Sequence, residues 1–129
     1  MLSAYWTANG FCFMDDILKD FVIETTEAID VVDAGLVRFE QESNNEAVLA
    51  QIFRLVHTVK GTCGFLGLPR LEALAHASET VIGQFRDGVS VTTQAVSLIL
   101  TTIDRIKLII CELEFNGCEP EGSDGELID

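Results

Sequence analysis

Two histidines, a lysine and a glutamate stand at spacings that bring them together on a pair of helices. Lys60 follows His57 by three residues, and Glu79 follows His76 by three, so each pair is one helical turn apart on one face. The segment VHTVKGTCGFLG (56–67) also contains three glycines, each of which costs a helix about 1 kcal/mol relative to alanine. Glycines beside a histidine clear space for a partner surface and for whatever the imidazole carries. The pattern therefore predicts an accessible, chemically active imidazole at position 57.

The two histidines should lie at the same height on an antiparallel helix pair. The turn between the helices is centred near residues 66–67, about ten residues after His57 and about nine before His76. Their heights should therefore agree within one residue's rise of ~1.5 Å. His57 is about 100° around its helix from the apolar Val56, so we expect it outside the buried stripe. Its neighbours along the exposed row are Ala50, Arg54, Gly61 and Gly64.

Helical periodicity dominates the chain and predicts four helices. The first spans about 15–41, and the second runs from a Ser43–Glu46 capping box to about Phe65, with Gly64 and Gly67 as its stop. The third starts at Pro69 and ends near residues 86–88, and the fourth runs from Thr92 or Thr93 to about Phe115. The inner stripe expected for the second helix is Leu49, Ile52, Phe53, Val56, Val59 and Cys63.

Short loops between consecutive long helices predict an all-α, antiparallel up-down four-helix bundle, with room for a short extra C-terminal helix. We expect the bundle over 15–115, a loose N-terminal arm over 1–14 and an acidic linker or tail over 116–129. The tail is rich in turn-forming residues and acids and offers little to bury.

Charge and hydropathy exclude several classes of function. The net charge is −13, and residues 112–129 hold seven acids and no Lys or Arg. A chain this acidic, without a basic stripe, is unsuited to nucleic acid or anionic membranes. The most apolar run, residues 95–110, is broken by three charged residues, and the N-terminus lacks the basic region of a signal peptide. The four cysteines show neither a C-x-x-C nor a zinc spacing, which favours reduced thiols in the cytoplasm.

The run HTVKGTCGFLGLPRLEALAHASE (57–79) resembles the histidine phosphotransfer (HPt) domain at the front of the chemotaxis kinase CheA. That family has a phosphorylatable histidine followed by x-x-K-G, a Gly-rich helix end, and a second histidine 19 residues on with a glutamate three later. Positions 57, 60, 61, 76 and 79 match, and the wider resemblance covers about 15–115.

The resemblance implies a role for each of these residues. His57 would accept a phosphoryl group from ATP on a separate CheA-type kinase catalytic domain and pass it to an aspartate of a CheY-type response regulator. Glu79 would accept a hydrogen bond from one ring nitrogen of His57 and fix its tautomer, and Lys60 would help neutralise the phosphoryl oxygens. His76 would bridge this network. A partner surface would include Arg54, Gly61, Gly64, Phe65 and Leu66.

Three alternatives remain open on the sequence alone. His57, His76 and Glu79 could form a His₂Glu metal site, although Lys60 beside them would repel a cation. The chain could instead be a plain helical interaction module, or a free-standing phosphorelay protein. No G-x-x-x-x-G-K phosphate loop is present, so we expect no cofactor on this domain and ATP on another one.

Overall fold

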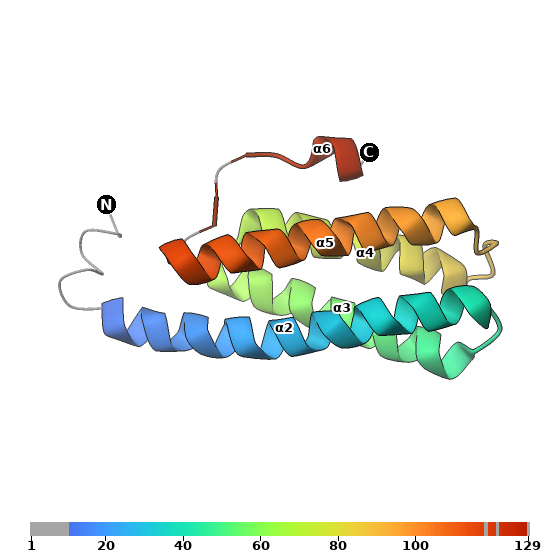
Figure 1. Cartoon of the computed structure of the whole chain (residues 1–129), viewed down its shortest axis with the longest axis horizontal. Coiled ribbons are helices and arrows are strands. Elements are labelled where there is room, and N and C mark those ends of the chain that lie inside the picture. The colour runs from blue at the N-terminus through green and yellow to red at the C-terminus, as the bar shows by residue number, and fades with distance from the viewer. Residues whose placement is uncertain (1–10, 118, 121, 129) are drawn as a thin grey trace.

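The structure, a computed structural model, describes residues 11–117, 119–120 and 122–128. Within these residues the chain forms four long helices joined by short loops, followed by one short helix, and no strand (Figure 1). The helices are α2 (Phe11–Gln41), α3 (Glu46–Leu66), α4 (Pro69–Arg86), α5 (Thr93–Asn116) and α6 (Gly125–Ile128). This confirms the predicted all-α bundle and its short C-terminal helix.

Each long helix packs against two others, so the four form a closed ring around a single core. The neighbouring pairs are α2–α3, α3–α4, α4–α5 and α2–α5, and successive helices run antiparallel (Figure 1). Apolar stripes on all four helices supply this core. Its buried side chains include Phe21, Ile29, Val32, Leu36 and Phe39; Leu49, Ile52, Val56, Val59 and Cys63; Leu71, Leu74, Ala75, Ile82 and Phe85; and Val96, Ile99, Ile103, Ile106, Ile110 and Leu113.

Two helix starts differ from the sequence-based expectation. Helix α2 begins at Phe11 rather than at Asp15, so the helix includes the last four residues of the expected arm, whose first ten lie outside the described residues. Helix α3 begins after Asn45, whose side chain accepts a hydrogen bond from Val48 N at 3.2 Å. Asn45, not Ser43, is therefore the N-cap, because the capping oxygen must reach a backbone N–H of the first turn.

A tight turn between α3 and α4 fixes the pair that carries the predicted site. Gly67 has φ 71°, a left-handed conformation that favours glycine. Its N–H bonds to the carbonyl of Gly64, and Leu68 N bonds to the carbonyl of Cys63 at 2.9 Å, which is the Schellman pattern. Gly67 therefore ends α3, whereas Gly64 lies inside the helix and does not serve as its stop.

The C-terminal segment folds back onto the bundle, contrary to the expectation of a tail with little to bury. The carboxylate of Glu119 accepts hydrogen bonds from the backbone N–H groups of Arg70 (3.0 Å) and Leu71 (2.8 Å), so it caps the start of α4. The Arg70 guanidinium donates to both carboxylate oxygens of Asp124, at 2.9 and 2.8 Å, and Arg105 donates to it at 2.6 Å. Asp124 is buried, and we call these four charged residues the tail clamp.

We expect Asp124→Asn to lower the free energy of unfolding by roughly 2 kcal/mol, because it leaves two guanidinium groups beside a neutral side chain. The hydrogen bonds from Arg70 hold the pKa of Asp124 below its usual range. The stabilisation is therefore complete above the unfolded-state pKa and disappears as the pH falls through the folded-state value. Urea unfolding at neutral and acidic pH measures both effects.

The exposed Asp104→Asn is the matched control for this measurement. Equal losses of stability in the Asp124 and Asp104 variants at neutral pH would show that the tail clamp does not stabilise the fold.

Candidate functional site

The facing sides of α3 and α4 bring His57, Lys60 and Glu79 into one hydrogen-bonded group. Glu79 lies between the other two: Nδ1 of His57 bonds to its Oε2, and Lys60 Nζ donates to its Oε1 at 2.8 Å. His57 and Lys60 are one turn apart on α3, so a single carboxylate on α4 reaches both. Three of the four residues that the sequence analysis expected on one stretch of the helix pair are thus bonded to one another.

Burial differs sharply within this group. The Glu79 side chain is 12% exposed and the Lys60 side chain 26%, whereas His57 is 63% exposed. Burial alone would raise the pKa of the Glu79 carboxyl, but the hydrogen bonds from Lys60 and His57 outweigh it and leave that pKa below its usual value. Glu79 is therefore ionised at neutral pH and can only accept hydrogen bonds.

An ionised Glu79 determines the tautomer of a neutral His57. Because the carboxylate has no proton to donate, Nδ1 of His57 must carry the shared hydrogen. The other ring nitrogen, Nε2, then keeps its lone pair and belongs to a ring that is mostly exposed. The arrangement is that of an oriented imidazole nucleophile whose developing positive charge would face a carboxylate.

Open space borders the imidazole on two sides. A hollow of about 520 Å³ lies beside His57, with Phe53 and Gly83 among its lining residues. On the side toward the turn, a Cβ atom placed on Gly61 would meet no atom within 4 Å. The imidazole is therefore accessible from outside, and the part that the glycines play in admitting a partner stays a prediction.

Comparison with known proteins decides the family. The family model described as Hpt domain matches residues 16–108. The chain belongs to the Hpt domain family. This confirms the resemblance drawn from the residues between His57 and Glu79.

Several CheA proteins and one solved complex are similar to this Hpt domain. It is 31% identical over 116 residues to the sensor histidine kinase CheAY of Helicobacter pylori, and 34% identical over 105 residues to the chemotaxis protein CheA of Halobacterium salinarum. The matches cover 88% and 81% of this chain but only 14% and 16% of those proteins. The chain thus spans about a sixth of their length or less.

The solved structure is that of the phosphorylated P1 domain of CheA3 in complex with CheY6 from R. sphaeroides. It superposes with a TM-score of 0.81 and 31% sequence identity, covering 89% of this chain and 91% of that one. The similarity therefore extends over nearly the whole bundle.

His76 does not join the hydrogen-bonded group of this Hpt domain. Its side chain is exposed, and within the described residues no hydrogen bond or ion pair reaches its imidazole. The two oxygens of Glu79 are instead bonded by His57 and Lys60 from α3. The bridging role expected for His76 is not seen, because sequence spacing gave its height on α4 but not the direction of its side chain.

The five expected partner residues divide into two groups. Arg54, Gly61 and Phe65 are exposed, Phe65 by 87%, and Gly64 is exposed as well. A Cβ on Gly64 would lie 2.8 Å from a carboxylate oxygen of Glu72, so glycine here makes room for that side chain. Leu66 is half-buried and packs against the core, so little of it is left for a partner. The other four are exposed, and their role in partner binding stays a prediction.

Sequence reasoning placed Phe53 in the inner stripe but missed its contact with His57. The side chain is half-buried and packs against the core, and its ring also lies parallel to the imidazole of His57. Its spacing of four residues before His57 was the available signal, since residues i and i+4 are neighbours on a helix surface.

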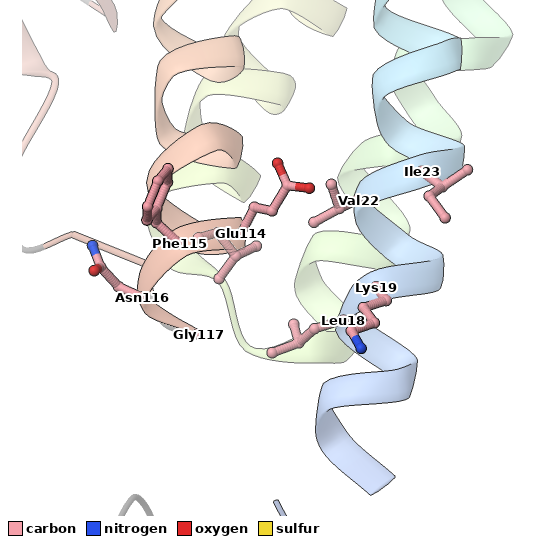
Figure 2. A pocket seen from close by; sticks show the side chains of 9 residues that line it. Leu18, Lys19, Val22, Ile23, Glu114, Phe115, Asn116 and Gly117 are labelled. Atoms are coloured by element: carbon pink, nitrogen blue, oxygen red, sulfur yellow. The ribbon is translucent and has the colours of Figure 1, made fainter. Parts of the chain in front are cut away.

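A second hollow, of about 390 Å³, lies between the start of α2 and the end of α5 (Figure 2). Leu18, Val22 and Ile23 line it from α2, and Leu113 and Phe115 from α5. These helices form the opposite side of the ring from the α3–α4 pair that carries His57. No histidine lines this groove, so it is separate from the imidazole site.

Two other functions considered from the sequence, metal binding and membrane spanning, can be checked against the part of the chain that the structure describes. Within them, no group of three or more His, Cys, Asp or Glu side chains is arranged to hold a metal ion. The His₂Glu alternative therefore gains no support from this part of the chain. None of the described helices combines the length and apolar character that a membrane crossing requires.

Proposed function

We propose that this Hpt domain carries a phosphoryl group on His57 between a kinase domain and a response regulator. The observation that carries the proposal is the geometry of one imidazole. Its Nδ1 is held by an ionised Glu79, and its Nε2 belongs to a ring that is 63% exposed. A nucleophile that must visit two large partners needs both a fixed tautomer and an uncovered ring.

The proposed reaction has two steps. In the first, the Nε2 lone pair of His57 attacks the γ-phosphorus of ATP bound to a separate kinase domain, the N–P bond forms, the bond to the β-phosphate oxygen breaks, and ADP leaves. In the second, a carboxylate oxygen of a receiver aspartate attacks the same phosphorus, and the N–P bond breaks to return the electron pair to Nε2. Glu79 stabilises the positive charge that the ring carries between the two steps.

Lys60 supports the carboxylate and stands close to where the phosphoryl group would arrive. Its ammonium group bonds to Glu79 and remains about a quarter exposed. A compact point charge on a flexible stem can turn from a carboxylate toward phosphoryl oxygens. We assign it this second role once phosphoryl transfer begins.

The similar proteins favour a chemotaxis kinase as the setting. The relatives described above carry the names CheAY and CheA, and the superposed structure is a phosphorylated P1 domain bound to CheY6. By analogy, we place this domain in a cytoplasmic CheA-type kinase, with ATP on another domain and a CheY-type receiver as acceptor. A free-standing phosphorelay protein of the same fold is the alternative, and it would use the same His57 chemistry.

Labelled ATP and a CheA-type kinase core provide the test. We expect the domain to acquire a label that is acid-labile and alkali-stable, as a phosphohistidine is, and to lose it when a CheY-type receiver is added. An acid-stable label would place the phosphoryl group on a hydroxyl and contradict the proposal. Retention of the label in the presence of several receivers would contradict the second step.

Glu79→Gln should slow phosphorylation of His57 by about 10- to 100-fold, while the bundle stays folded. The amide keeps the shape but removes the negative charge that holds the Nδ1 hydrogen and stabilises the charged ring. Initial rates with a kinase core and far-UV circular dichroism measure the two quantities.

The exposed Glu72→Gln on the same helix is the matched control, and it should leave the rate unchanged. If Glu79→Gln and Glu72→Gln reacted at the same rate, tautomer control by Glu79 would be excluded.

A further inference from the structure

The ring of Phe53 lies parallel to the imidazole of His57. Their centroids are 6.4 Å apart and their planes differ by 6°. Both values fall in the range of offset-stacked aromatic pairs, which stabilise by about 0.5–1.5 kcal/mol beyond the area they bury. The two residues are four apart on α3, so the helix itself sets their proximity.

The hydrogen bond to Glu79 leaves one motion of the imidazole free. It limits the separation of Nδ1 and the carboxylate oxygen, but rotation about the Cβ–Cγ bond can still tilt the ring over the range of angles at which the hydrogen bond survives. Histidine's second side-chain torsion is broad, so the rotamer alone does not prevent this tilt. Stacking against a neighbouring ring restricts it, because the two planes must stay parallel to keep their contact.

Residues of helix α4 also contact the ring of Phe53. The Arg86 guanidinium carbon lies 4.5 Å from the centroid of the Phe53 ring, within cation–π distance. A Cβ placed on Gly83 would come 3.5 Å from Phe53 Cε2, so α4 passes close to the ring at a residue without a side chain. Phe53 thus contacts both the imidazole on its own helix and a cation on the next.

We infer that Phe53 is a positioning residue for His57: together with Arg86 it fixes the plane of the imidazole and hence the direction of the Nε2 lone pair. This inference rests on the proposed phosphoryl transfer and adds a second constraint on the nucleophile, independent of Glu79. Phe53 acts through His57 and needs no contact with the phosphoryl group.

Phosphoramidate, a small phosphodonor, separates positioning from partner binding. Nε2 of His57 attacks its phosphorus, the N–P bond to the ammonia nitrogen breaks, and ammonia leaves after proton transfer. We expect Phe53→Leu to slow both this reaction and phosphorylation by a kinase core about two- to tenfold, the rate equivalent of one stacked pair. Phe53→Tyr, which keeps the ring, should restore both rates.

The exposed Phe115→Leu on α5 is the matched control, since it removes a phenylalanine far from the α3–α4 pair. NMR gives a second readout that a purely structural role would not change. The His57 ring protons should lose their aromatic ring-current shift in Phe53→Leu but keep it in Phe115→Leu.

Arg86→Gln tests the second half of the inference. It should slow the phosphoramidate reaction in the wild-type background and have no further effect in Phe53→Leu, because Arg86 acts through that ring. Equal effects of Arg86→Gln in both backgrounds would overturn the link between Arg86 and Phe53.

The other outcomes are equally decisive. If Phe53→Leu slowed only the reaction with the kinase core, Phe53 would be a partner contact and the positioning role would be overturned. Unchanged rates with both phosphodonors, or an unchanged His57 spectrum, would also overturn the positioning role. If wild-type His57 accepted phosphoryl from neither donor, the proposed function itself would fail, which a defect confined to Phe53→Leu cannot imitate.

Discussion

Replacing His57 with glutamine should abolish phosphorylation and leave the fold intact. The amide nitrogen has no lone pair available to attack phosphorus, so no N–P bond can form at this position. The wild-type side chain is 63% exposed and is not part of the core, so its loss removes no core packing, and Glu79 keeps its hydrogen bond from Lys60. Label from ATP measures the first effect, and thermal unfolding by circular dichroism measures the second.

His76→Gln is the control that this chain itself provides. His76 is the second histidine of the sequence, lies on the neighbouring helix, is exposed, and has no described contact with Glu79. We expect His76→Gln to be phosphorylated like the wild type. Label that persists in His57→Gln and disappears in His76→Gln would move the reacting imidazole to α4 and overturn the site.

Most of the bundle, and the grouping of His57, Lys60 and Glu79, were predictable because they depend on local periodicity. The apolar spacing on α3 placed Val56 and Val59 in the core, and His57 lies outside that stripe because it is about 100° from Val56. A turn of two residues, Gly67 and Leu68, then holds α3 and α4 as neighbours, which brings the two halves of the motif together. Counting from the turn put His57 level with His76, whereas the structure bonds His57 to Glu79, three residues further along α4.

Side-chain direction and long-range pairing were not predictable in this way. The periodic pattern of α3 gave Phe53 a place in the inner stripe, and its ring packs against the core, but the pattern did not show that the ring also lies parallel to His57 and close to Gly83 of α4. The tail clamp joins Arg70 to Asp124, 54 residues later. An acidic, turn-rich segment has the composition of a linker, and only the three-dimensional position of two arginines shows that it docks.

The tail clamp also gives acidic residues near the C-terminus a structural role. A helix that begins with Leu68 and Pro69 has no side chain of its own to cap it, and its first N–H groups need an acceptor. Glu119 supplies that acceptor from the end of the chain. At least one acid of the expected acidic tail therefore caps the first turn of α4, the helix that carries Glu79.

Val59→Asp should unfold the domain or leave it marginally stable. Val59 is 4% exposed, lies two residues after His57, and belongs to the core cluster. An aspartate there would place an unpaired charge among apolar side chains, at a cost of about 3–5 kcal/mol or more. A domain of this size has only about 5–15 kcal/mol in total. Urea unfolding followed by far-UV circular dichroism gives the loss directly.

Thr58→Asp tests whether the helix face, rather than the local sequence, decides this result. Thr58 is the neighbouring residue and is exposed, so the same charge there should change stability by only about 0.5 kcal/mol. The contrast between positions 58 and 59 depends on the same helix rotation that brings His57 to the surface. Equal stabilities of the two variants would mean that α3 is rotated about its axis, and the exposure of His57, on which phosphoryl transfer depends, would be lost with it.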